Sequence, residues 1–488
     1  MAAVSRKVSL AAVALWAWVG AAHADGTAAQ AARAFEESYA AYFGRTVLDK
    51  GIVKATADGA SVVVVWDLQK AAEALDAPPN ALKIGPFSYR LTPGDDGVWT
   101  LNSDALPRIE FDAPQDRERV RGVFDFDGFA LEGRWDPNRE PFLTSRLKLA
   151  ALNCDLTNLD PDNATRVHIA ESDITFDLRA QSAVNGGVDV AMANAAGAMS
   201  ETVQIGDAPP DASNFVAIDA SGASGVVAAS ALKAQEIGQF WRYAVAHQDD
   251  RPAARRAFEL ANAALPLWNE IGGQAVLRGV KARSTLGAAD IKSLGESFTS
   301  SGLVDEGKLQ FGFDFQDLAV NFPGAPPWAA SLTPASLKIA FGVSDSGVGK
   351  AARLLLTDPS AGNGGVSPET SEAMDRAIRD GHPKLILAPS RLKTPAIDLA
   401  FQGEAELKPE IKSARLKVSA DSLDKAMAIV ADLAQDQPDM RQALLTLSLF
   451  KGLAKTDADG RMSWDVVVEG DAVSVNGAPL SGGGGGVK

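Results

Sequence analysis

The stretch Leu309-Gln310-Phe311-Gly312-Phe313-Asp314-Phe315-Gln316 decides the fold, because apolar and non-apolar residues alternate through it without a break. Successive side chains of a β-strand point to opposite faces, so this pattern predicts a strand with one dry face and one wet face. Residues 337–343 and 397–401 repeat the alternation. One-faced strands of this kind favour antiparallel pairing.

More strands are predicted towards the N-terminus, over residues 61–68, 123–135, 147–149 and 174–178. In 123–135 the alternation slips at Asp127-Gly128, which indicates a bulge or a tight turn.

A hairpin is predicted where residues 87–91 and 98–101 flank Pro93-Gly94-Asp95-Asp96-Gly97, since Gly and Asp are turn formers.

Helices are predicted where apolar residues recur at a spacing of three and four. In the first of them Thr27 is the expected N-cap, and Phe35, Tyr39 and Tyr42 share one face. The second helix of the middle of the chain is expected to start at Asp249-Asp250. The expected helical ranges are 25–43, 237–244, 249–265, 367–381, 422–433 and 438–454.

Strands outnumber helices in this pattern, so we expect an α+β protein with a long, curved, mainly antiparallel β-sheet and several packing helices. The best linker candidates are residues 185–213 and 358–366, which are rich in small and turn-forming residues. The predicted organisation is a signal peptide at 1–24, an N-terminal β-rich region with a leading helix at 25–212, a helical middle segment at 213–275, a C-terminal sheet with helices at 276–480, and a disordered Gly-rich tail at 481–488.

The N-terminus has the features of a secretory signal. Arg6-Lys7 precedes an apolar run over residues 8–19, and Ala22-His23-Ala24 is a small-residue cleavage site before Asp25. The run is too short to cross a hydrocarbon core of about 30 Å. We therefore predict a periplasmic protein with a cleaved signal and no transmembrane segment in the mature chain; a retained anchor is the alternative.

The composition restricts the partners. The 488-residue chain is 46% hydrophobic and carries a formal net charge of −15, which repels nucleic acid and anionic head groups. Cys154 is the only cysteine, so an internal disulfide is excluded and a large core has to provide the stability. The expected partner is a lipid or another envelope protein.

No catalytic or metal-binding pattern is found. His168 and Glu171 are expected on opposite faces of a strand, His247 is expected to cap a helix end, and His382 is expected in a loop. Ser-x-x-Lys occurs at Ser230, Ser390 and Ser422, without the companion motifs of the penicillin-binding class. We predict no catalytic residue, no metal ligand and no cofactor, and the ligand-binding residues are not identified by the sequence.

The last part of the chain resembles a known group. The features are His382-Pro383-Lys384-Leu385 before a strand, residues 447–454 (Leu-Ser-Leu-Phe-Lys-Gly-Leu-Ala), Gly460-Arg461-Met462-Ser463-Trp464, and the closing Val475-Asn476-Gly477. They resemble an alphaproteobacterial exported family of unknown function, and more distantly the YdgA-like and AsmA-like envelope proteins. The resemblance implies an envelope location and lipid handling, and it supplies no catalytic residues. AsmA-like proteins usually keep a membrane anchor, whereas this signal has a cleavage site.

Three hypotheses follow for the dry faces of the strands. The first is a non-enzymatic envelope protein that binds a lipid or other apolar ligand along a curved sheet. The second is a structural or assembly module whose sheets close on each other without a ligand. The third is a hydrolase with a dispersed acidic site, which would need carboxylates that converge in a pocket.

Overall fold

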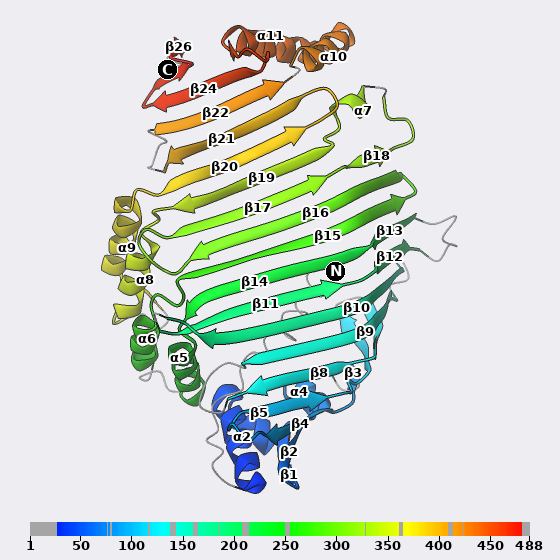
Figure 1. The fold of residues 1–488 in the computed structure, drawn as a ribbon, viewed down its shortest axis with the longest axis vertical. Helices are drawn as coiled ribbons and strands as arrows, with labels where there is room; N and C mark the ends of the chain where they lie inside the picture. The colour runs from blue at the N-terminus through cyan, green and yellow to red at the C-terminus, as the bar shows by residue number, and fades with distance from the viewer. Residues whose placement is uncertain are drawn as a thin grey trace. The chain divides into compact units, whose positions relative to one another are not determined.

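The computed structural model describes residues 27–75, 77–78, 81–115, 118–136, 143–159, 164–184, 186–206, 214–248, 254–326, 328–360, 365–407, 413–421 and 423–480. The predicted signal peptide at 1–24, the predicted tail at 481–488 and the predicted helix start at Asp249-Asp250 lie outside these residues. With 25% of the chain in helices and 51% in an antiparallel sheet, the predicted α+β class with a long antiparallel sheet is confirmed (Figure 1).

The chain divides into two compact units. The N-terminal unit spans residues 1–271 and 355–368, and the C-terminal unit spans 272–354 and 369–488.

The N-terminal unit holds five helices and fourteen strands among the described residues. They are α2 (Ala28–Phe43), α3 (Thr46–Asp49), β1 (Val53–Asp58), β2 (Ser61–Trp66), α4 (Leu68–Ala74), β3 (Leu82–Ile84), β4 (Phe87–Pro93), β5 (Trp99–Ser103), β6 (Ile109–Gln115), β7 (Glu118–Asp127), β8 (Ala130–Trp135), β9 (Thr144–Asn158), β10 (Thr165–Ser182), β11 (Val188–Ala196), β12 (Met199–Ile205), β13 (Asn214–Ala220), β14 (Gly222–Leu232), α5 (Ala234–Ala246) and α6 (Ala254–Ala263).

The C-terminal unit holds the remaining elements. They are β15 (Glu270–Ser284), β16 (Gly287–Ser301), β17 (Lys308–Gln316), β18 (Ala319–Asn321), α7 (Ala329–Leu332), β19 (Ser336–Ser344), α8 (Val348–Thr357), α9 (Pro368–Asp380), β20 (Lys384–Lys393), β21 (Asp398–Glu406), β22 (Ser413–Asp421), α10 (Leu423–Asp436), α11 (Pro438–Gly452), β23 (Lys455–Thr456), β24 (Met462–Glu469), β25 (Ala472–Val475) and β26 (Ala478–Leu480).

The core of the N-terminal unit forms where α2 lies against the first strands. Thr27 is the N-cap of this helix, as its sequence predicts, and its amide donates to Gln30 Oε1 at 2.8 Å in a capping box. Phe35, which is fully buried, contacts the rings of Trp99 and Trp135 with centroids 5.7 and 4.7 Å away. Tyr39 is buried beside it, and its hydroxyl pairs with that of Tyr89. The predicted apolar face of this helix is therefore the centre of the first core.

In the N-terminal unit several neighbouring strands are interrupted at adjacent positions across the sheet. β7 and β8 follow each other along β9, with Gly122 opposite Leu156 and Leu131 opposite Leu147. The break at Asp127-Gly128 is therefore an irregularity between two strands that run on in the same direction, and it is not a hairpin turn. β11 and β12 follow each other along β10 in the same way, and β14 and β13 along β11 and β12.

This line of breaks, which we call the crease, runs through Gly128, Asp173, Gly197 and Ser221. Gly128 and Asp173 have positive φ angles of 63° and 52°. The amide of Ala198 donates to Ser172 Oγ at 3.1 Å, which satisfies a group that the ladder leaves free. Such breaks change the direction of a strand without ending the sheet.

The C-terminal unit is a meander. Its strands pair in the order β16, β17, β19, β20, β21, β22, β24, β25 and β26 (Figure 1). The last turn is Asn476-Gly477, with positive φ angles of 54° and 83°, as a two-residue hairpin turn of this type requires. Helices α8 and α9 lie beside the strand ends (Figure 1). They lie at the ends of the strands and not along their length (Figure 1).

Two sequence expectations are corrected. The expected helical segment at 213–275 begins with strands β13 and β14, and helix starts only at Ala234. The linker candidate at 185–213 contains β11 and β12, which are paired on both sides. Both stretches are rich in Ala, Ser and Gly, which give little periodic signal, so neighbouring strands decide their conformation.

Candidate functional site

The dry face of the C-terminal sheet is continuous across its central strands. Leu309 and Phe311 of β17 lie opposite Val343 and Phe341 of β19, as the alternation predicts. The same face continues over β20, β21, β22 and β24. The register places apolar residues at its positions there, with Gly403 and Ser390 as the exceptions. No charged residue stands at a dry-face position of these six strands. A continuous apolar surface therefore runs across the strands.

Much of this surface is open to solvent. Five large apolar side chains of the face, which we call the apolar row, are each more than a third exposed. They are Leu309 at 42%, Phe311 at 45%, Phe341 at 53%, Leu385 at 42% and Leu416 at 37%. Exposed apolar patches of this extent mark binding surfaces in folded proteins.

Helices α10 and α11 cover the same face at one end only. Leu423 and Met427 of α10, with Leu447 of α11, pack on Val418 and on Trp464, which is 6% exposed. The indole of Trp464 donates to the carbonyl of Phe450 at 2.7 Å. Coverage by the two helices thus separates the buried end of the dry face from the apolar row.

The wet face of these strands is charged and paired. Arg391 donates to both carboxylate oxygens of Asp398, with Nε to Oδ1 at 2.7 Å, and this contact lowers the pKa of Asp398. Lys384 lies 3.7 Å from Asp345. The two faces of one sheet therefore have opposite chemical character.

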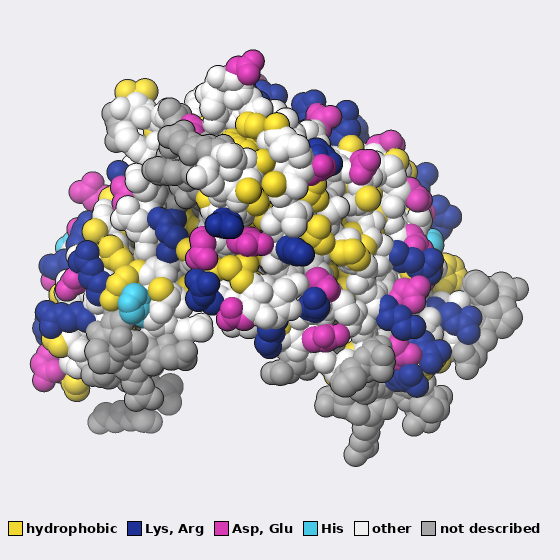
Figure 2. Space-filling view, turned by 90° about the horizontal axis from the view of Figure 1, so that it is seen from below, with side chains coloured by type: hydrophobic (Ala, Val, Ile, Leu, Met, Phe, Trp, Pro, Cys, Tyr) yellow, Lys and Arg dark blue, Asp and Glu magenta, His cyan; other side chains and the backbone are white. Residues whose placement is uncertain are grey.

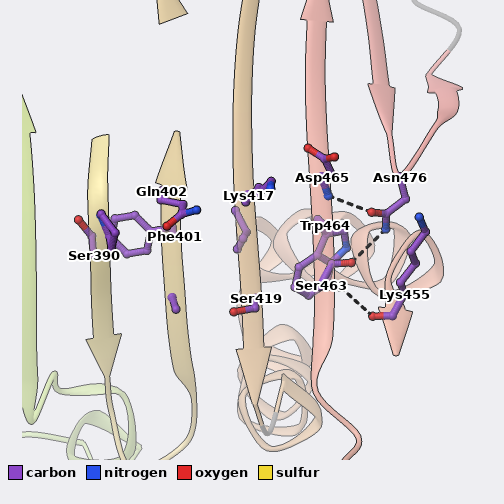
Figure 3. Close-up of a pocket in the computed structure, with 13 residues that line it drawn as sticks. Ser390, Phe401, Gln402, Lys417, Ser419, Lys455, Ser463, Trp464, Asp465 and Asn476 are labelled. Atoms are coloured by element: carbon purple, nitrogen blue, oxygen red, sulfur yellow. Dashed lines mark hydrogen bonds between the residues drawn. The ribbon is translucent and has the colours of Figure 1, made fainter. Parts of the chain in front are cut away.

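A cavity of about 410 Å³ lies at β20 to β25 (Figure 3). Lys417 and Ser419 of β22 line it with Gln402 of β21, and Asn476 closes one side. The amide of Asn476 is fully engaged, since its Nδ2 donates to Leu453 O and Ser463 O, and its Oδ1 accepts from Asp465 N.

Among the described residues that line this cavity, Asp465 is the one carboxylate, and none is a histidine or a cysteine. A hydrolase needs two groups that exchange a proton, so this cavity gives no support to the hydrolase hypothesis. Ser390, at the other side of the cavity, accepts from Ala340 N and donates to Ala388 O. Its register places it on the dry face, whereas Lys393 is on the wet face, so the two do not form a pair.

The histidines lie as the sequence predicts. His168 Nδ1 lies 2.7 Å from Asp155 on the wet face of β10, and Glu171 is on the other face. His247 Nδ1 donates to the carbonyl of Tyr243 at 2.9 Å, and His382 lies in a turn. Within the described residues, no group of three His, Cys, Asp or Glu side chains is arranged to hold a metal ion.

The N-terminal unit has a dry face of its own on β9, β10, β12 and β13. Cys154 is buried there opposite Ile169, and burial raises the pKa of its thiol to about 11. Two carboxylates, Glu171 and Glu201, stand at positions of this face. Burial raises the pKa of Glu171. The sequence signal for both is a Glu in phase with alternating apolar residues, as in Met199, Glu201, Val203 and Ile205.

No helix of the described residues is long and apolar enough to span a membrane. Comparisons with known proteins give no relatives: no family model, no curated protein and no solved structure matches the chain. The resemblance to exported envelope proteins therefore stays a prediction.

Proposed function

We propose that this protein is a non-enzymatic periplasmic envelope protein that binds a lipid or other apolar ligand along the dry face of its antiparallel sheet. The observation that carries the proposal is the apolar row, in which five large side chains of one uncharged face are each more than a third exposed. Figure 2 views the protein from below Figure 1, a different side from the row, and shows hydrophobic side chains lying among charged groups there.

The dimensions favour an extended ligand. The row crosses β17, β19, β20, β21 and β22, whose spacing of about 4.8 Å makes it roughly 19 Å long. One lipid chain spans about 15 Å of a bilayer whose core is about 30 Å thick. The row therefore has the length scale of one acyl chain.

The energetics point the same way. The exposed parts of the five side chains amount to on the order of 300 Å² of apolar area. Covering them contributes about 7 kcal/mol, which is of the same order as the cost of association. A ligand must therefore also reach less exposed neighbours such as Phe313 and Ile339, which an extended chain does better than a compact molecule.

The structural-module hypothesis is the second candidate. It needs a closed core, and the covered end of the sheet beneath α10 and α11 is such a core. The open apolar row favours the ligand-binding proposal over it.

Lipid transfer tests the proposal directly. The purified mature protein is incubated with vesicles of phosphatidylethanolamine and phosphatidylglycerol, separated from them, and analysed by native mass spectrometry. We expect bound lipid, and a roughly tenfold loss for the Phe311→Gln/Phe341→Gln variant. The matched control is Phe322→Gln, because Phe322 is 52% exposed and lies outside the row. No uptake by the wild type, or equal uptake by all three proteins, would refute the proposal.

A further inference from the structure

The dry face of the N-terminal unit carries a second exposed apolar patch. Val216 and Ile218 of β13 lie opposite Val203 and Glu201 of β12, and Ile205 is next along β12 on the same face. Three of these side chains are well exposed: Ile205 at 43%, Val216 at 40% and Ile218 at 40%. We call these three the β12–β13 patch.

Charge distinguishes this patch from the apolar row. Glu201 lies opposite Ile169 and Ile218, and Glu171 lies opposite Leu152 and Met199. The two glutamates are diagonal neighbours on adjacent strands. Residues at such positions are about 7 Å apart. The patch therefore has a carboxylate pair at its border with the crease.

Neither glutamate side chain has a hydrogen bond or ion pair within the described part of the chain. The basic residues of β9 and β10, such as Arg146 and Arg166, stand at wet-face positions. On the dry face of β9, β10, β12 and β13 every described charged position is thus acidic.

An unpaired carboxylate beside apolar side chains costs free energy unless a partner compensates for it. The raised pKa of Glu171 reflects that cost. A ligand that combined an apolar chain with a cationic head would cover the patch and neutralise the carboxylates at once.

Resting on the proposed ligand-binding function, we propose that the β12–β13 patch binds an amphiphile with a primary ammonium head. The alkyl chain lies on Ile205, Val216 and Ile218. The ammonium group donates hydrogen bonds to Glu171 and Glu201. Amphiphiles with an anionic head are rejected by the same two groups, since like charges repel.

Ligands of equal chain length and different heads test the proposal. Binding of decylammonium, decanol and decanoate to the mature protein is measured by calorimetry at pH 7 and 150 mM salt, which screens long-range effects of the net charge. We expect decylammonium to bind about tenfold more tightly than decanol, and decanoate most weakly. The Glu171→Gln/Glu201→Gln variant should bind decylammonium and decanol alike.

The matched control removes two exposed carboxylates elsewhere in the same unit, as Glu73→Gln/Glu132→Gln. It should keep the preference for the ammonium head. If decanol binds and decylammonium binds no more tightly, the inference is wrong and the proposed function stands. If none of the three ligands binds, the inference is wrong, and uptake of vesicle lipid decides the proposed function separately. A preference lost equally in both double variants would also overturn the inference, because it would be an effect of net charge.

Discussion

Phe311 and Phe341 lie directly opposite each other on β17 and β19, with ring centroids 6.3 Å apart, and each leaves about half of its side chain exposed. An aromatic pair in a core is normally covered on all sides. Here the strands supply the pair and no described element covers it. The pair therefore leaves apolar surface open to solvent and contributes less stability than a covered pair would.

Two phenylalanines should differ sharply in their contribution to stability. Phe35→Ala removes a fully buried ring between Trp99 and Trp135, and should lower the free energy of unfolding by about 3–5 kcal/mol. Phe341→Ala removes a ring that is 53% exposed, and should cost about 1 kcal/mol or less. Urea titration followed by circular dichroism measures both. Equal losses would mean that the row is covered in solution.

The alternation in residues 309–316 was enough to predict the dry and wet faces of the sheet, because the order of apolar and polar residues within one strand shows which side chains share a face. It was not enough to predict which part of the dry face is open. Leu416 and Val418 stand two residues apart on one face of β22, yet Val418 packs beneath α10 and α11 while Leu416 is 37% exposed. Coverage depends on how α10 and α11, which follow β22 directly, fold back over the sheet, and the alternation within β22 does not encode that.

The site residues show the same limit. The sequence placed Glu171 on the face opposite His168, and the structure agrees. Its desolvation depends on Leu152 and Met199, which reach it from two other strands. Strands β13 and β14 were missed for a related reason, since small residues follow the conformation of their neighbours.

The crease requires glycine at position 128. Gly128 and Gly59 share a φ angle of 63°, so Ala at either position pays the same backbone strain of about 1 kcal/mol. A Cβ at Gly128 would also lie 2.6 Å from the Cβ of Ala150, whereas nothing lies within 4 Å at Gly59. Gly128→Ala should therefore destabilise the protein by about 1–3 kcal/mol more than Gly59→Ala in thermal or urea unfolding. Equal effects would show that the strands can part at the crease without cost.

The Arg391–Asp398 pair should make stability fall in acid. The pKa of Asp398 is lowered in the folded protein, so its contribution is complete above the unfolded pKa and is lost as the pH falls through the folded pKa. Asp398→Asn should cost about 1 kcal/mol at pH 7, a modest value because Arg391 is 58% exposed, and the difference from wild type should disappear once the pH falls below the folded pKa. Unfolding free energies at several pH values measure this. A difference that persists in strong acid would assign the effect to packing.

Cys154 should report opening of the N-terminal sheet. Its side chain is 2% exposed and its thiol has a pKa of about 11, so little thiolate forms at pH 8 and a disulfide reagent has no direct access. We expect labelling by dithiobis-nitrobenzoate to be slower by a factor of about 100 or more than in Cys154→Ser/Val184→Cys, whose introduced thiol stands at a fully exposed position. Denaturant should accelerate the labelling of Cys154. Rapid labelling of the native protein would contradict the burial of this face.

Glu171→Gln should stabilise the free protein at neutral pH. Burial raises the folded pKa of Glu171 above its unfolded value, so the folded state holds its proton more tightly and stability decreases as the pH rises from the unfolded pKa through the folded one. Gln keeps the shape of the protonated acid without the charge, so the variant should melt at a higher temperature at pH 7 and at the same temperature near pH 3. Calorimetric melting curves at the two pH values give the comparison, and Glu132→Gln, at an exposed position, should melt like the wild type at both. If Glu171→Gln lowers the melting temperature at pH 7, the carboxylate has a partner in the free protein, and the case for a cationic ligand at the β12–β13 patch loses its basis.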